Sequence, residues 1–242
     1  MILLIDAGNT RIKWGITRDA TWLADGSLAH GEIAGLAARL RAFAGVRRVL
    51  GANVAGARIA ADIAAALQET MPPPQWLQAT EHCCGVHNGY TQPAQLGPDR
   101  WAALIGARHL QRGACLVVTA GTATTVDLLD AQGRFQGGLI LPGEELMRRS
   151  LARDTAELPF AEGRYEATPR CTADAIVSGC LNAQAGAVER MFRQLDAAPD
   201  ARCLVSGGGA ARLLPLLNVP SRHVDNLVLK GLAVVAGEAH TP

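Results

Sequence analysis

The chain has 242 residues, enough for one large domain or two small ones with a substantial buried core. Hydrophobic residues make up 49% and aromatic residues only 4%, which is typical of an α/β protein with alanine-rich helices. The 23 basic residues nearly balance the 22 acidic ones, and no segment is apolar enough to span a membrane, so we expect no nucleic-acid and no membrane partner.

The amino terminus and the cysteines indicate where the protein works. Asp6 interrupts the first apolar stretch and no cleavage pattern follows it, so this stretch is not a signal peptide. The six cysteines are scattered and form no C-x-x-C pair, which is typical of thiols that stay reduced. We therefore expect a cytoplasmic protein.

A hairpin opens the chain. Residues 2–5 form a short apolar run, Asp6 follows it, and residues 7–10 are small or polar. Residues 12–16 then alternate between apolar and polar, as a half-buried strand does. This pattern predicts two antiparallel strands with a carboxylate at the end of the first.

The turn of this hairpin has the composition of a phosphate site. Gly8 and Asn9 tolerate positive φ, so backbone N–H groups can point into the turn and hold a phosphate. Thr10 adds a hydroxyl, Lys13 a cation, and Asp6 the hard oxygen ligand that magnesium prefers. The alternative is an ordinary hairpin whose Asp and Asn only stabilise their own turn.

The same layout returns between residues 115 and 129. An apolar strand at residues 116–119 leads into a turn of small residues at 120–124 and a returning strand at 125–129. Repeats decide the architecture of a chain, and two such hairpins predict a duplicated domain with a nucleotide between the halves. We place the halves at residues 1–112 and 113–242.

The other predicted elements follow in chain order. In the first half they are a third strand near residues 22–23, a helix at 32–44, a strand at 46–54, a helix at 58–70, a loop at 72–95 with a short strand at 76–78, and a helix at 97–110. In the second half they are a helix from Glu144, a helix at 173–195 with Thr172 as its N-cap, a strand at 203–206 before the glycine turn 207–209, and a closing helix at 227–239 that we expect to pack back on the first half.

The start of the helix at residues 97–110 offers two charged groups side by side. Pro98 suits the first helical turn, and Asp99 complements the helix dipole. An aspartate near a helix start is often no more than that. In a catalytic role, Arg100 could bind a substrate carboxylate in a bidentate fork, and Asp99 could accept a hydroxyl proton. We expect the dipole and the arginine to keep Asp99 ionised, which makes it a weak base, and a weak base suffices for phosphoryl transfer.

Motifs of other nucleotide-binding folds are absent. The sequence has no G-x-x-x-x-G-K-[ST] and no G-x-G-x-x-G after a strand, which excludes a P-loop kinase and a dinucleotide fold. Two phosphate-type hairpins and a late glycine turn resemble instead the superfamily of sugar kinases, acetate kinases, actin and Hsp70.

Four motifs narrow the resemblance. Asp6-Ala-Gly-Asn-Thr-Arg-Ile-Lys13, Gly97-Pro-Asp-Arg100, Gly121-Thr-Ala-Thr-Thr-Val-Asp127 and Gly137-Gly-x-Ile-x-Pro-Gly143 together resemble type III pantothenate kinase in order and spacing. With Thr172-x-x-Ala-Ile176 they cover most of the chain. The resemblance implies an α/β fold of two duplicated RNase H-like (actin-like ATPase) domains with mixed sheets flanked by helices, a homodimer, and ATP-dependent phosphorylation of pantothenate, the first step of coenzyme A synthesis.

The resemblance also implies roles for individual residues. Asp99 would be the catalytic base, and Asp6 would hold the magnesium ion. The expected ATP-binding residues are Asp6, Ala7, Gly8, Asn9, Thr10, Arg11, Ile12, Lys13 and Thr122. The expected pantothenate-binding residues are Tyr90, Gly97, Pro98, Asp99, Arg100 and Thr172, the last of them from the partner subunit.

One position departs from the family pattern. Many members carry an aspartate before the second turn as a ligand of a potassium or ammonium ion, and this chain has Thr119 there. The resemblance alone therefore does not imply a monovalent-cation site in this chain. The alternative to a kinase is a non-catalytic regulator that keeps the fold and binds nucleotide, as an accessory factor for transcription. Asp6, Lys13, Asp99 and Arg100 favour the kinase, because a regulator needs no base beside a phosphate turn.

Overall fold

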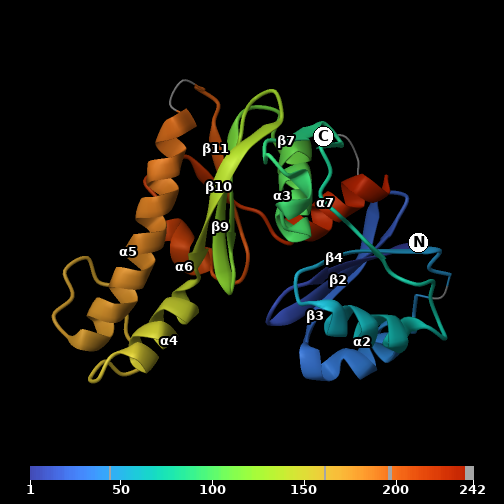
Figure 1. The fold of residues 1–242 in the computed structure, drawn as a ribbon, viewed down its shortest axis with the longest axis horizontal. Coiled ribbons are helices and arrows are strands. Elements are labelled where there is room, and N and C mark those ends of the chain that lie inside the picture. The colour runs from blue at the N-terminus through green and yellow to red at the C-terminus, as the bar shows by residue number, and fades with distance from the viewer. Residues whose placement is uncertain (44, 161, 196–197, 238–242) are drawn as a thin grey trace. The chain divides into compact units, whose positions relative to one another are not determined.

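The structure is a computed structural model that describes residues 1–43, 45–160, 162–195 and 198–237 (Figure 1). Its contacts divide the chain into two compact units. Unit 1 holds residues 1–112, residues 133–135 and the chain from Asn226 on, and unit 2 holds residues 113–132 and 136–225. The division into domains at residues 112 and 113 stays a prediction. Within the described part of the chain, no helix combines the length and the apolar character needed to cross a membrane.

Unit 1 is built on a mixed sheet of five strands in the order β3-β2-β1-β4-β5. The hairpin β1–β2 is antiparallel, with Asp6 opposite Lys13, and β4 runs parallel to β1 on its other side. The strands are β1 (Ile2–Ala7), β2 (Arg11–Arg18), β3 (Thr21–Ala29), β4 (Arg48–Asn53) and β5 (Gln75–Trp76).

The two faces of β1 have different partners. Successive side chains of a strand point to opposite faces, so Leu3, Ile5 and Ala7 share one face. These three are fully buried in a core with residues of α1 (Leu36–Leu40) and α2 (Ala57–Leu67). Asp6 therefore lies on the opposite face of the sheet, the one that packs against α3 (Pro98–Leu110) and α7 (Leu227–Ala236).

The helices α3 and α7 pack closely because of two glycines. A Cβ atom on Gly106 would come within 2.8 Å of the Leu227 carbonyl oxygen, and a Cβ on Gly231 would overlap the backbone of Ala102. The closing helix α7 belongs to unit 1, and residues 238 and 239 of the predicted range lie outside the described residues.

Unit 2 repeats the strand arrangement of unit 1. Its strands follow the order β12-β11-β8-β9-β10, with β8 and β9 antiparallel and β11 parallel to β8. Each unit therefore has an antiparallel hairpin whose first strand lies beside a parallel one, which confirms the duplicated α/β fold. The strands are β8 (Cys115–Ala120), β9 (Ala123–Leu129), β10 (Arg134–Pro142, in unit 2 from Gln136 on), β11 (Arg202–Ser206) and β12 (Ser221–His223).

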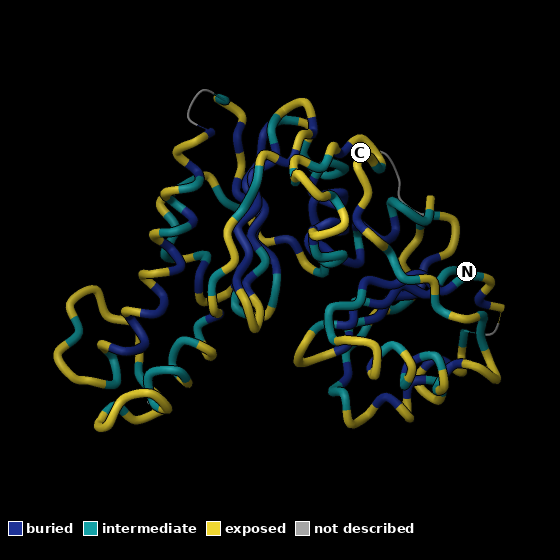
Figure 2. The backbone as a smooth tube through the Cα atoms, viewed as in Figure 1, coloured by how far each residue is buried: buried dark blue, intermediate teal, exposed yellow. Residues whose placement is uncertain are grey.

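Helix α5 (Thr172–Phe192) covers one face of this sheet. Apolar residues of β8 and β9 pack with Ala185, Val188 and Phe192 of α5, and these strands are buried through most of their length (Figure 2). Helix α4 (Glu144–Asp154) packs against α5, and α6 (Ala210–Leu213) follows β11.

Several local predictions differ from the structure. The third strand is longer than the expected residues 22–23, because its pairing with β2 extends it to Ala29. The expected helix at residues 32–44 is instead a 3-10 turn (His30–Gly35) followed by the short α1, and residue 44 lies outside the described residues. Thr172 is the first residue of α5 and Cys171 is its N-cap, so the prediction that Thr172 caps this helix is wrong.

The loop at residues 72–95 holds more structure than its composition indicates. A two-residue strand β6 (His82–Cys83) pairs with β7 (Val86–Asn88), and β7 pairs with Arg134 and Phe135 at the start of β10. A 3-10 turn (Pro93–Gln95) then leads into α3, and two more 3-10 turns, Arg193–Leu195 and Leu214–Leu216, follow α5 and α6.

Candidate active site

The turn of the first hairpin presents backbone and side chains to solvent. The Gly8 N–H donates to the Arg11 carbonyl oxygen at 3.1 Å, which closes the turn between β1 and β2. Asn9, Thr10 and Arg11 are exposed, while Ala7 and Ile12 are buried where they anchor the two strands. This arrangement can hold a phosphate group against the tip of a rigid hairpin.

His30 fixes one peptide of that turn. Its Nε2 atom lies 2.9 Å from the Gly8 carbonyl oxygen, so Nε2 carries the proton and donates it. A peptide is planar and trans, so the N–H of Asn9 points away from the carbonyl oxygen that His30 holds. The histidine thereby orients a donor of the turn.

Asp6 and Asp99 are within electrostatic reach of each other. Burial raises the pKa of Asp6 to about 6; Lys13, directly across the hairpin, opposes this, and the Asp99 carboxylate adds to it. Burial also raises the pKa of Asp99, against the opposing effects of the Arg100 backbone N–H and guanidinium. Asp99 thus raises the proton affinity of Asp6, and two half-buried carboxylates this close together can bind a cation or hold a transferable proton.

The backbone at the start of α3 shapes the surroundings of Asp99. An Oδ1 atom of Asp99 accepts the N–H of Arg100 at 2.8 Å. A Cβ atom on Gly97 would lie 2.7 Å from the same oxygen, so glycine at this position leaves room for the carboxylate. Pro98 is the first residue of the helix. The sequence Gly97-Pro98-Asp99 thus holds the carboxylate in one place.

Arg100 is buried beside a pair of aromatic rings. Its Nη1 donates to the Tyr90 hydroxyl at 2.8 Å, and its guanidinium lies 5.6 Å from the Tyr90 ring centre and 5.7 Å from that of Phe135. The two rings are themselves 5.3 Å apart. Cation–π contacts of this length hold a guanidinium in a fixed orientation.

In unit 2 the second turn is the counterpart of the first. The Gly121 N–H donates to the Ala123 carbonyl oxygen at 3.0 Å, and Thr122 is exposed at the tip. Thr119 lies opposite Thr125 in the hairpin and is partly exposed.

Thr172 is exposed at the start of α5 and lines a cavity of about 880 Å³. The cavity lies along α4 and α5 and is mostly apolar, and its lining includes Met147, Leu151, Ile176 and the charged Arg170.

The predicted residues therefore fall into two groups. Unit 1 contains Asp6 to Lys13, Tyr90 and Gly97 to Arg100. Within it Asp6 lies near Asp99, and the Tyr90 hydroxyl accepts a hydrogen bond from Arg100. Unit 2 contains Thr119, Thr122 and Thr172. The roles assigned to these residues stay predictions.

Comparison with known proteins then decides the family. A sequence model of the type III pantothenate kinase family matches residues 2–194. The chain belongs to the type III pantothenate kinase family. A type III pantothenate kinase of Aromatoleum aromaticum is 66% identical over 238 residues, covering 98% of each chain.

Two solved structures share the fold at low identity. One, from Campylobacter jejuni and named for the Baf family of transcriptional activators, has a TM-score of 0.64 at 19% identity over 98% of each chain. The other, from Sinorhizobium meliloti and named as a 2-dehydro-3-deoxygalactonokinase, has a TM-score of 0.61 at 18% identity over 98% of each chain. At such identities both bear on the fold alone, and they agree with two duplicated α/β units built on mixed sheets.

Sequence reasoning missed His30 and Phe135. His30 directly follows β3, whose pairing with β2 carries it beside the first turn, but the length of β3 is not visible in its polar sequence. Phe135 is an apolar residue after a turn, and nothing local indicates that β7 pairs with it and brings it to Tyr90.

The electrostatics of Asp99 also differ from expectation. The sequence predicts that the helix dipole and Arg100 keep this carboxylate ionised and make it a weak base. Burial outweighs the backbone N–H and the guanidinium of Arg100, so the pKa of Asp99 is raised rather than lowered. In this family member Asp99 is a stronger base than an exposed aspartate.

Proposed function

We propose that this chain transfers the γ-phosphoryl group of ATP to the hydroxyl of pantothenate, giving 4′-phosphopantothenate and ADP in the first step of coenzyme A synthesis. The observation that carries the proposal is the 66% identity over nearly the whole chain to a type III pantothenate kinase. The site also supports phosphoryl transfer, because Asp6 and Asp99 lie near each other beside a hairpin turn that can hold phosphate. No observation favours a non-catalytic regulator over this reaction.

In the proposed reaction Asp99 accepts the proton of the substrate hydroxyl. The hydroxyl oxygen forms a bond to the γ-phosphorus, the bond from that phosphorus to the bridging oxygen breaks, and ADP leaves with the electron pair. The raised pKa of Asp99 makes it a stronger proton acceptor than an exposed aspartate, which suits this role. Phosphoryl transfer depends mainly on positioning and charge stabilisation. Gly97 and the Arg100 N–H provide this positioning for Asp99.

The turn at Gly8 to Lys13 and Thr122 are the proposed contacts to the ATP phosphates. Among the described residues, no group of three or more His, Cys, Asp or Glu side chains could hold a metal ion. A magnesium ion is often held by one or two carboxylates together with substrate phosphates, and Asp6 fits this pattern because a cation would relieve its repulsion from Asp99. Magnesium would offset charge on the phosphates. Residue 119 is a threonine, so a potassium or ammonium ion in the proposed site would have no carboxylate ligand at this position.

Tyr90, Arg100 and Thr172 are the proposed contacts to pantothenate. The guanidinium of Arg100 would bind its carboxylate, and the aromatic rings that orient the guanidinium make it a preformed site. Because Thr172 lies in unit 2 on an exposed helix start, we propose that it reaches the substrate of a partner subunit in a homodimer. The six cysteines are free, which supports the cytoplasm as the place of action.

The test is release of ADP by the purified protein, with and without pantothenate, followed by mass analysis of the product. The proposal predicts that ADP release depends on pantothenate and that one phosphoryl group is added to it. Nucleotide binding without turnover, whatever acceptor is offered, would overturn it in favour of a regulator.

A further inference from the structure

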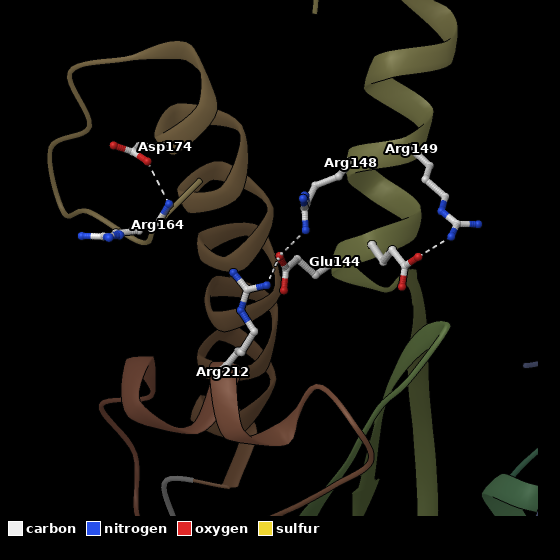
Figure 3. A network of polar contacts seen from close by, with 7 residues as sticks. Glu144, Arg148, Arg149, Arg164, Asp174 and Arg212 are labelled. Atoms are coloured by element: carbon white, nitrogen blue, oxygen red, sulfur yellow. Dashed lines mark hydrogen bonds and ion pairs between the residues drawn. The ribbon is translucent and has the colours of Figure 1, made fainter. Parts of the chain in front are cut away.

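A shielded ionic cluster lies at the start of α4 in unit 2. Glu144 is the first residue of this helix, and one of its carboxylate oxygens is 2.7 Å from Nη1 of Arg212 and 3.5 Å from Nη1 of Arg148. Figure 3 shows both arginines pointing to Glu144, Arg148 from the same helix and Arg212 from α6. Glu144 and Arg148 keep only 14% and 11% of their side-chain surface exposed, so solvent screens the Glu144 carboxylate weakly, while Arg212 is 45% exposed and reaches the carboxylate from the surface.

Glu144 follows a residue that is bonded to the second turn. The N–H of Gly143 donates to the Thr122 carbonyl oxygen at 2.9 Å. A Cβ atom on Gly143 would overlap the Gly121 carbonyl oxygen, so only glycine lets the start of α4 approach the turn this closely. The start of α4 is therefore joined to the tip of the β8–β9 hairpin by a backbone hydrogen bond and close packing.

Arg212 follows a segment that is bonded to the same hairpin. The N–H of Gly209 donates to the Ala120 carbonyl oxygen at 2.9 Å. Gly207 has a φ of 97°, and a Cβ on it would lie 2.3 Å from that oxygen. The glycine turn at residues 207–209 thus packs on the backbone of the second turn from another side, and Arg212 is the third residue of the helix α6 that follows.

We propose that Glu144 and Arg212 act as a clamp that fixes the spacing between the second turn and the glycine turn, and that this spacing sets the affinity for ATP. The inference rests on the proposed function, in which the second turn contacts the ATP phosphates. Glu144 and Arg212 are positioning residues and do not touch the nucleotide. Glu144 lies in the first turn of α4, where the helix dipole favours a negative charge, and it forms an ion pair with the Arg212 guanidinium.

The same helix turn offers a matched control. Glu145 forms an ion pair with Arg149, one helical turn on, and Arg149 lies on the other side of α4 from Arg148 (Figure 3). The side chains of Glu145 and Arg149 are 64% and 67% exposed, and within the described part of the chain neither forms an ion pair with α6. Glu145→Gln therefore removes the same charge from the same turn of helix without touching the clamp.

The experiment measures Mg–ATP binding by calorimetry, together with KM for ATP, KM for pantothenate and kcat, in Glu144→Gln, Arg212→Met and Glu145→Gln. The clamp predicts that Glu144→Gln and Arg212→Met each weaken ATP binding by about threefold to tenfold, with pantothenate KM and kcat within about twofold of native. The double variant should bind ATP no worse than the weaker single one, because the two residues act as a unit. Arg212→Lys should restore part of the loss.

Three results would overturn the clamp. They are unchanged ATP binding in both single variants, equal losses in ATP and pantothenate KM, or an effect of Glu145→Gln as large as that of Glu144→Gln. If Glu144→Gln does not fold, Arg212→Met and Arg212→Lys still decide the question. Calorimetry does not depend on turnover, so normal ATP binding with no pantothenate-dependent ADP release would refute the proposed function and leave the clamp to be judged by binding alone.

Discussion

Asp6→Asn should make the metal-free protein more stable at neutral pH while it removes activity. Asp6 is half-buried on the sheet face that packs against α3, and burial raises its pKa to about 6. Asp99 increases this effect and Lys13 opposes it. At neutral pH the folded chain therefore carries an ionised Asp6 in surroundings that disfavour its charge. Such a cost in stability is expected for a residue that is needed for catalysis or binding.

The magnitude follows from linkage between protonation and folding. The difference between the ordinary value of 3.8 and about 6 corresponds to up to about 3 kcal/mol, because one pKa unit is about 1.4 kcal/mol. The folded state holds the proton more tightly than the unfolded state does. The cost is therefore absent below about pH 4, grows between about pH 4 and 6, and is complete above about pH 6.

The assay is urea unfolding of native protein and Asp6→Asn at several pH values from 5 to 8, with EDTA and without nucleotide. The variant should gain stability over native protein as the pH rises to about 6 and hold that gain above it. Asp62→Asn, which removes an exposed carboxylate of α2, is the control. In turnover, Asp6→Asn should weaken use of Mg–ATP much more than binding of pantothenate. A variant that is less stable than native at pH 7.5, or a difference that does not change with pH, would refute the reasoning.

Three further outcomes are expected. His30→Leu should raise KM for ATP about threefold or more and His30→Gln should restore much of it, because the amide can donate to Gly8; equal KM values in both variants would remove His30 from the site. Mixing inactive Asp99→Asn and Thr172→Arg subunits should restore some activity, since one hybrid site is intact; inactivity after proven subunit exchange would mean that each site is built within one chain. Activation by potassium at constant ionic strength should be shallow, and Thr119→Asp should strengthen it; tight activation that this variant fails to improve would show that other groups hold the ion.

The parts of the fold that were predicted correctly depend on local sequence. Both hairpins were visible because alternating apolar residues meet small-residue turns, and the start of α3 was visible because Gly97, Pro98 and Asp99 are helix-start residues. The repeat then predicted the duplicated fold, which the matching strand orders of the two units confirm.

The parts that were missed depend on contacts distant in sequence. The strand β7 and the position of Phe135 follow from pairing across more than forty residues, which no local pattern encodes. His30 reaches Gly8 only because β3 is long. The raised pKa of Asp99 follows from packing around it, whereas its sequence neighbours favour a lowered one.

The most direct measurement is kcat for pantothenate-dependent ADP release in native protein and in Asp99→Asn, across the acid side of the pH profile. We predict that the variant folds, keeps both KM values, and loses about a hundredfold or more in kcat. In native protein, kcat should fall as the pH drops through the pKa of Asp99, at a pH above the ordinary aspartate value of 3.8. An Asp99→Asn variant with near-native kcat would contradict the assignment of Asp99 as the base.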